Sequence, residues 1–201
     1  PFLRPDNPAV MNTLAVHQQI FSWLYPINQA WQKQEKAGLG IGRYPGDIYD
    51  GTGFSRAGIW PLITAWYGRI HFYLYRRLQD PDQRLDPNAD SYKLLFGNIP
   101  LSKTSEQTLK QGFGYLEWIL AHMDSDHLMT EQINDQTGNP QGAEGLAWGY
   151  RELNRLLNDV YRWLETDPKS DIEPYAQELK QIVFHLNRIF RVFRGYDTVS
   201  A

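Results

Sequence analysis

The chain has 201 residues, of which 42% are hydrophobic and 14% aromatic, and its formal net charge is -3 at pH 7. This apolar content is sufficient for a packed core and excludes a disordered chain. Because there is no basic excess to neutralise a phosphate backbone, we expect no nucleic acid as a partner. The sequence contains no run of 18 apolar residues, so we also expect no membrane partner.

The spacing of apolar residues predicts helices from the start of the chain. In residues 8–36 the apolar side chains recur at steps of three and four, and Pro26 should kink this helix or split it in two. A second helix is predicted from near Trp60 to the Asp80-Pro81 pair, because proline cannot continue a helix.

The second half of the chain has the same periodicity. A third helix is expected after Ser102 and Ser105, which are both plausible N-caps, and it extends to about Met123. Two further helices are predicted at 143–165 and 171–194. No stretch of comparable length alternates as a strand would. The sequence therefore predicts an all-α chain of antiparallel helices.

Two of the intervening loops are long and polar. Residues 37–58 are rich in glycine but also carry charged and tyrosine side chains, and residues 124–142 combine carboxylates, amides and turn residues. Long loops in a compact helical domain are more often functional than idle. If successive helices are antiparallel, both loops emerge at the same end of the domain. The linker 80–101 should lie at the opposite end, and we assign it no chemistry.

A loop carboxylate at Glu131 is the most distinctive candidate for chemistry. The string MTEQ at 129–132 is followed by a glycine- and proline-containing turn and by a helix start that contains Trp148. A carboxylate held rigidly beside a helix start and an indole has what a general base needs in order to deprotonate a water molecule. Local composition alone favours the alternative of a solvated loop glutamate.

A second candidate lies in the string GRYPGDIY. Arg43 and Asp47 are four residues apart and can form an ion pair that orients the guanidinium group, which leaves its other donors for ligand hydroxyls. Tyr44 and Tyr49 add flat faces suited to sugar rings. A surface ion pair in a glycine-rich turn explains the spacing equally well.

These strings resemble a known family when they are taken together. GIGRYPGDIYDG, GIWPLITAWYGRIHFYLYRRL and HLMTEQINDQTGNPQGAEGLAWGY are similar, in order and spacing, to the second half of the catalytic domain of glucoamylases and glucodextranases, glycoside hydrolase family 15. The resemblance covers roughly residues 38–165. The string GIWPL resembles the bacterial branch of this family, and the related helical domain of phosphorylase kinase regulatory subunits, more than it resembles the fungal version, GNPWFL.

The resemblance implies a fold, an activity and a set of site residues. It implies that residues 1–201 are the C-terminal portion of a single (α/α)6 barrel, a catalytic domain that hydrolyses α-glucosidic bonds with inversion and releases glucose from the non-reducing ends of α-glucans. Glu131 matches the general base. The matching sugar-site positions are Arg43, Tyr44, Asp47, Trp60, Gln132 and Trp148, and Tyr49 joins them as an aromatic face.

The general acid of such a site has no counterpart in this sequence, so we expect it to come from outside these residues, in the remainder of the barrel. The expected ligand is an α-glucan. Because the five histidines lack metal-ligand spacing and there is no cysteine, we expect no metal and no cofactor. The similarity to kinase regulatory subunits leaves one alternative, a non-catalytic helical module that binds glucan or protein.

Overall fold

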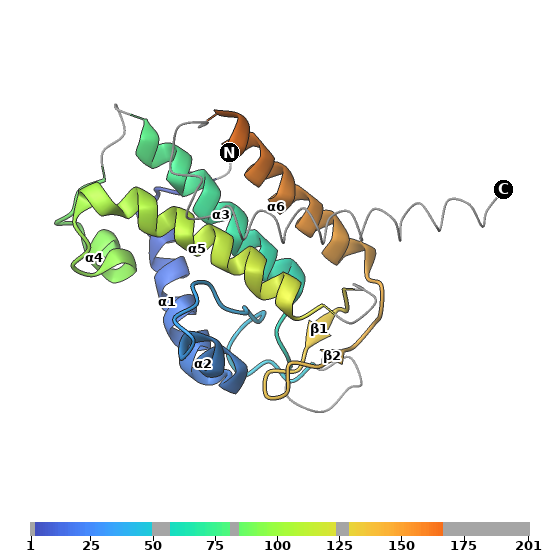
Figure 1. Ribbon diagram of the computed structural model, residues 1–201. Helices are drawn as coiled ribbons and strands as arrows, with labels where there is room; N and C mark the ends of the chain where they lie inside the picture. The colour runs from blue at the N-terminus through green and yellow to red at the C-terminus, as the bar shows by residue number, and fades with distance from the viewer. Residues whose placement is uncertain (1–2, 50–56, 81–84, 124–128, 167–201) are drawn as a thin grey trace.

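The computed structural model describes residues 3–49, 57–80, 85–123 and 129–166 (Figure 1). The helix predicted at 171–194 lies outside these residues. The elements follow one another as α1 (Pro8–Leu24), α2 (Pro26–Gln32), α3 (Pro61–Gln79), α4 (Asp90–Phe96), α5 (Leu101–Ala121), β1 (Gln132–Ile133), β2 (Pro140–Gln141) and α6 (Ala147–Thr166). None of the described helices is long and apolar enough to cross a membrane.

Proline and glycine set several of the helix boundaries. The predicted break at Pro26 is confirmed, because α1 ends at Leu24 and α2 begins at Pro26. Proline also stands in the first turn of α1 and α3, where its missing N–H is not needed. The start of α6 is later than predicted, because Gly142 and Gly145 adopt positive φ angles and the backbone becomes helical only at Ala147.

The predicted caps of the third helix are wrong. This helix, α5, begins at Leu101 with Pro100 at the N-cap position, so Ser102 and Ser105 both lie inside its first turns. The short elements α4 and the β1–β2 hairpin were not predicted either. The helix α4 has seven residues and each strand has two, which is too short for hydrophobic periodicity to reveal them.

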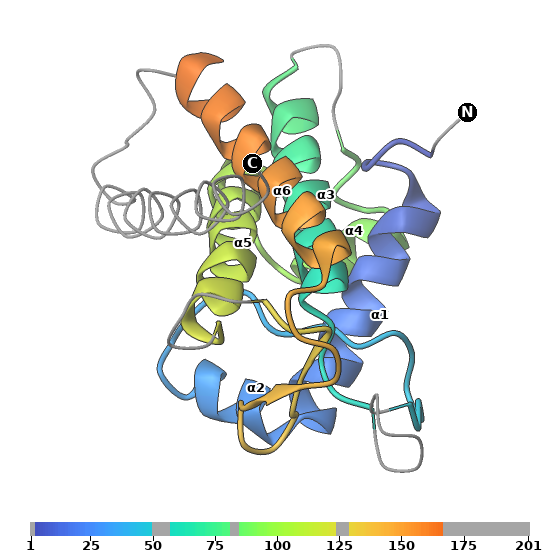
Figure 2. The same cartoon turned by 90° about the vertical axis from the view of Figure 1, so that its right-hand side faces the viewer.

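The core is formed mainly where α3 packs between α5 and α6 (Figures 1 and 2). Large aromatic side chains fill it, among them Tyr115, Trp118 and Trp163, each with at most 1% of its surface exposed. Burying a side chain of this size contributes roughly 2–3 kcal/mol. The rings of Phe113 and Trp163 meet edge to face with centroids 5.3 Å apart, which ties α5 to α6.

A partly buried polar cluster joins α1 to α3 and α5. The side-chain amide of Gln18 donates to the Tyr115 hydroxyl at 2.9 Å and lies 3.2 Å from His71 Nε2. His71 Nδ1 lies 2.7 Å from the carbonyl of Tyr67, so it donates there and leaves Nε2 as an acceptor. Complete burial lowers the pKa of His71 to about 4, and the ring therefore stays neutral at physiological pH.

The two long polar loops meet at one end of the domain, as the antiparallel succession predicts. The backbone groups of Ile59 and Ile133 exchange two hydrogen bonds of 2.8 Å, and the Trp60 N–H donates to the Ile41 carbonyl at 2.9 Å. The helix α4 lies at the other end of α5 (Figure 1). The segments around Ile41, Ile59 and Ile133 therefore run side by side at the loop end, and they carry the candidate site.

Candidate active site

The backbone that leads into Arg43 is held by two buried polar side chains. Asn28, on α2, donates to the Gly40 carbonyl and accepts from the Gly40 N–H, both at 2.8 Å. The hydroxyl of Thr64, on α3, accepts from the Ile41 N–H at 3.0 Å. Each contact fixes a backbone group that would otherwise be buried without a partner. The segment before Arg43 is therefore a rigid support and not a free loop.

Arg43 and Asp47 form the ion pair that their spacing predicts. Arg43 donates through Nε and Nη2 to the two carboxylate oxygens of Asp47, at 2.5 and 2.7 Å. The Asp47 side chain is 2% exposed and also accepts from the Tyr49 N–H at 3.1 Å. The hydrogen bonds from Arg43 lower the pKa of Asp47, and the same pair raises the pKa of Arg43. The guanidinium group is thus oriented and neutralised by a nearly buried carboxylate.

Three aromatic rings surround this guanidinium group. Its central carbon lies 4.9 Å from the ring centroids of both Tyr49 and Trp60, and 5.7 Å from that of Tyr44. Trp60 is 7% exposed, whereas both tyrosines are exposed. The structure therefore brings five of the predicted site residues into one group.

Two buried donors near this group have no partner in the described part of the chain. They are the indole Nε1 of Trp60 and the side-chain amide Nε2 of Gln132. The other end of the Gln132 amide is occupied, because Oε1 accepts from the Gly58 N–H at 2.8 Å. Buried N–H groups without partners are costly, and in a native protein they call for a water or a ligand.

Glu131 lies on the adjacent loop and is half-buried. Its N–H donates to the Ala143 carbonyl at 2.8 Å. The carboxylate stands against Gly142, where a Cβ atom would lie only 2.8 Å from Glu131 Oε2. Among the residues that the structure describes, no side chain forms a hydrogen bond or ion pair with this carboxylate. The backbone of Glu131 is therefore anchored, and its carboxylate oxygens are left open to a water molecule or a ligand.

Trp148 does not join the group around Arg43. It lies in the first turn of α6 and is 65% exposed, and it has no ring contact with the Arg43 group within the described ranges. Glu131 and Arg43, which both lie within the described ranges, form no hydrogen bond or ion pair with each other either. The structure thus places Glu131 and Trp148 at the same end of the domain as Arg43, and not in direct contact with it.

Comparisons with known proteins give the family of this chain. A model of the family described as Glycosyl hydrolases family 15 matches residues 1–157. The chain belongs to glycoside hydrolase family 15. It is 31% identical over 169 residues to the intracellular sporulation-specific glucoamylase of Saccharomyces cerevisiae, covering 72% of this chain and 30% of that protein. A glucoamylase of Saccharomycopsis fibuligera is 26% identical over 181 residues, covering 77% and 34%.

Solved structures show the fold to which this family 15 chain contributes. The glucoamylase structure of Hormoconis resinae matches with a TM-score of 0.65 at 20% identity, over 78% of this chain and 28% of that one. The prediction of an all-α chain that forms part of an (α/α)6 barrel is confirmed. The chain spans about a third of the length of these relatives.

Several residues that build the site of this family 15 chain were not predicted. Asn28 and Thr64 hold the segment before Arg43, and Gly142 leaves room for the Glu131 carboxylate. One signal was present for Asn28, because it follows Phe21 by seven residues and so interrupts an apolar stripe. A polar residue in such a stripe needs a buried partner. The sequence contains no such signal for Gly142.

The described part of this family 15 chain contains no group of three His, Asp or Glu side chains that could hold a metal ion. A cavity of about 450 Å³ lies between α1, α4, α5 and the segment 36–39. Its lining includes Gln18, Lys93 and Gln111, and none of the predicted site residues. We assign the candidate site by its chemistry, and this cavity plays no part in it.

Proposed function

We propose that this protein hydrolyses α-glucosidic bonds with inversion, releasing glucose from the non-reducing ends of α-glucans. Glu131 takes a proton from a water molecule, whose oxygen bonds to the anomeric carbon as the bond to the glycosidic oxygen breaks. A carboxylic acid from outside these residues, in the remainder of the barrel, donates its proton to that leaving oxygen. In inverting enzymes the two carboxyl groups are about 6.5–9.5 Å apart, which leaves space for the water.

The observation that carries this proposal is the combination of donors around Trp60. Arg43 offers an oriented guanidinium group, and the buried N–H groups of Trp60 and Gln132 lack acceptors among the described residues. Because Asp47 already neutralises Arg43, the group suits a neutral ligand better than an anion. The aromatic faces favour a ring-shaped ligand. A neutral ring with many hydroxyl oxygens is a sugar.

The environment of Glu131 supports its role as the base. Its loop is attached to both neighbouring segments, and its carboxylate is half-buried without a partner in the described chain. A general base needs this combination of fixed position and free oxygen atoms. The relatives in family 15 are named glucoamylases, and the family is one of glycosyl hydrolases. These names support the same reaction for the protein that contains this chain.

The first test is product analysis with the full-length protein. Proton NMR should show β-glucose appearing first from maltose and longer maltooligosaccharides, before mutarotation. Initial release of α-glucose would contradict inversion. If calorimetry detects binding of maltooligosaccharides but no glucose is released, the protein is a non-catalytic glucan-binding module. If neither binding nor release is detected, the carbohydrate site itself is refuted.

Gly142 provides a more local test of the position of Glu131. In Gly142→Ala the added Cβ would lie 2.8 Å from Glu131 Oε2, so the carboxylate must move. We expect kcat for maltose to fall by about tenfold, because small displacements of a reacting group have large kinetic effects. The matched control is Gly145→Ala, which has a similar positive φ but no atom within 4 Å of the added Cβ. Equal losses in both variants would attribute the effect to backbone strain and not to Glu131.

A further inference from the structure

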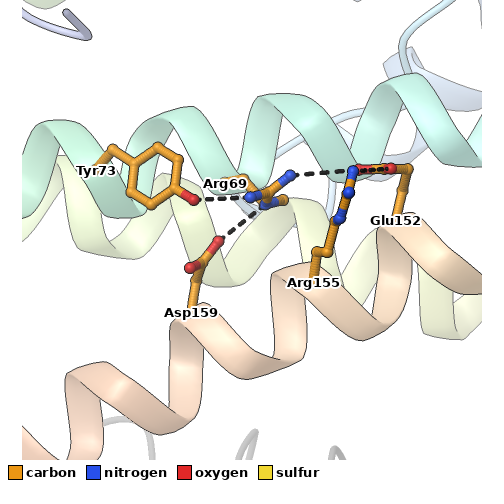
Figure 3. A network of polar contacts seen from close by, with 5 residues as sticks. All are labelled: Arg69, Tyr73, Glu152, Arg155 and Asp159. Atoms are coloured by element: carbon orange, nitrogen blue, oxygen red, sulfur yellow. Dashed lines mark hydrogen bonds and ion pairs between the residues drawn. The ribbon is translucent and has the colours of Figure 1, made fainter.

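Every nitrogen of the Arg69 guanidinium group has a partner, and two of the three join α3 to α6 (Figure 3). Nε donates to Asp159 Oδ2 at 2.9 Å, Nη1 to Glu152 Oε2 at 3.3 Å, and Nη2 to the hydroxyl of Tyr73 at 2.7 Å. Glu152 also accepts from Arg155 at 2.6 Å. Two arginines and two carboxylates are thus joined in one network between the two helices.

The two carboxylates make this network specific for one position of α6. Glu152 and Asp159 are about two helical turns apart, so they lie on the same face of α6. Their side chains are only 6% and 4% exposed. A shift of α6 by one turn along α3, about 5.4 Å, would leave at least one of them buried without its cation.

Buried ion networks are poor sources of stability, because desolvation offsets most of their attraction. Apolar side chains of similar volume often stabilise a protein at least as well. Here the apolar contact is already close, since a Cβ on Gly68 would lie 3.1 Å from the Leu156 side chain. The contribution of the network is therefore to fix the position of α6 relative to α3.

The Glu131 loop is attached to both of these helices. On one side, the Met129 N–H donates to the hydroxyl of Tyr150, in α6, at 2.8 Å. On the other side, Ile133 pairs with Ile59, next to the residue that precedes α3. Glu131 lies between these two attachments. Its position relative to Trp60 and Arg43 therefore depends on how α6 is placed along α3.

We propose that Arg69 is a positioning residue for the candidate active site. It places α6 along α3 and thereby sets the distance between the Glu131 carboxylate and the sugar-binding group of Arg43 and Trp60. It acts from roughly 13 Å along the helix from Trp60, at the rise of an α-helix. This inference rests on the proposed function.

The test is a steady-state comparison in the full-length protein, with maltose as substrate and well below the melting temperature. Arg69→Met should lower kcat by at least tenfold and change KM by less than about threefold, because the sugar-binding groups remain attached to α3. The matched control is Arg77→Met on the same helix. Arg77 pairs with Asp6 and Asp80, at 3.5 and 3.3 Å, and neither lies on α6. Its kcat should stay within about twofold of the wild type.

A triple variant separates position from stability. Arg69→Met combined with Glu152→Leu and Asp159→Leu removes Arg69 and both buried carboxylates of the network at once and should restore the melting temperature. Its kcat should stay low. If kcat recovers together with the melting temperature, or if Arg69→Met keeps kcat within threefold of the wild type, the inference is overturned.

Two further variants make the result unambiguous. Arg69→Lys keeps the positive charge but loses the forked guanidinium donors, so its kcat should lie between those of the wild type and Arg69→Met. If Arg69→Met fails to fold, Arg69→Lys replaces it in the comparison. An inactive wild type would overturn the proposed function and this inference with it. A wild type that loses activity in Glu131→Gln but not in the Arg69 variants would overturn only the inference.

Discussion

Glu131→Gln should lower kcat for maltose by about 10²–10⁴-fold in the full-length protein, the range expected when a general base is removed. The amide has nearly the shape of the carboxylate but cannot take the proton of the attacking water. Because the sugar-binding group around Arg43 is unchanged, KM should change by less than about threefold. Steady-state kinetics with maltose and with soluble starch measure both quantities.

The control for this substitution is Glu144→Gln. Glu144 is an exposed carboxylate on the same loop, and removing its charge should leave kcat within about twofold of the wild type. A decrease of less than about tenfold in Glu131→Gln would show that another group activates the water. The assignment of Glu131 as the base would then be wrong, even if the protein releases glucose.

Arg43→Met should damage both sugar binding and stability. Losing the hydrogen bonds of a charged group should lower kcat/KM for maltose by about ten- to a hundredfold. It also leaves Asp47, whose side chain is 2% exposed, without its cation. Breaking a buried pair in this way costs about 3 kcal/mol, near the lower end for such pairs because Arg43 is itself one-third exposed. Thermal melts and maltose kinetics measure the two effects separately.

The stability loss should depend on pH. In the wild type, Arg43 lowers the pKa of Asp47, so the pair stabilises the protein above the ordinary pKa of an aspartate and this contribution is lost as the pH falls through the lowered pKa. In Arg43→Met the buried carboxyl has no cation, and burial raises its pKa. The deficit relative to the wild type should therefore be largest at neutral pH and shrink as the pH falls through the raised pKa of Asp47 in the variant.

A double variant distinguishes the two effects of Arg43. Arg43→Met with Asp47→Asn removes both charges and should recover much of the melting temperature, because no buried charge is left unpaired. It should not recover kcat/KM, since the donors for the sugar hydroxyls are still missing. Wild-type kcat/KM in Arg43→Met would show that this guanidinium group does not contact the substrate.

Arg43 and Arg69 both pair with buried carboxylates, but in different roles. Arg43 pairs within its own loop, four residues from Asp47, and presents a neutralised group to the candidate sugar site. Arg69 pairs across two helices and presents nothing to a ligand. Only the second depends on how helices are placed relative to each other. For that reason its predicted effect is on kcat, whereas that of Arg43 includes substrate binding and the stability of the loop.

The sequence alone determined the features that depend on neighbouring residues. Pro26 divides α1 from α2 because the ring removes a helical N–H, and apolar steps of three and four predicted α3, α5 and α6 to within a few residues. The pair of Arg43 and Asp47 followed from a separation of four residues. The meeting of the two polar loops followed from the alternation of antiparallel helices.

Only the tertiary structure decided the features that join distant residues. The amide of Gln132 meets Gly58 across 74 residues, and Arg69 meets Glu152 across 83. The buried donors of Trp60 and Gln132, and the space that Gly142 leaves for Glu131, depend on packing that no local pattern records. Neighbouring residues restrict which backbone angles a segment adopts, but the partner of a buried polar group is chosen by the folded chain as a whole.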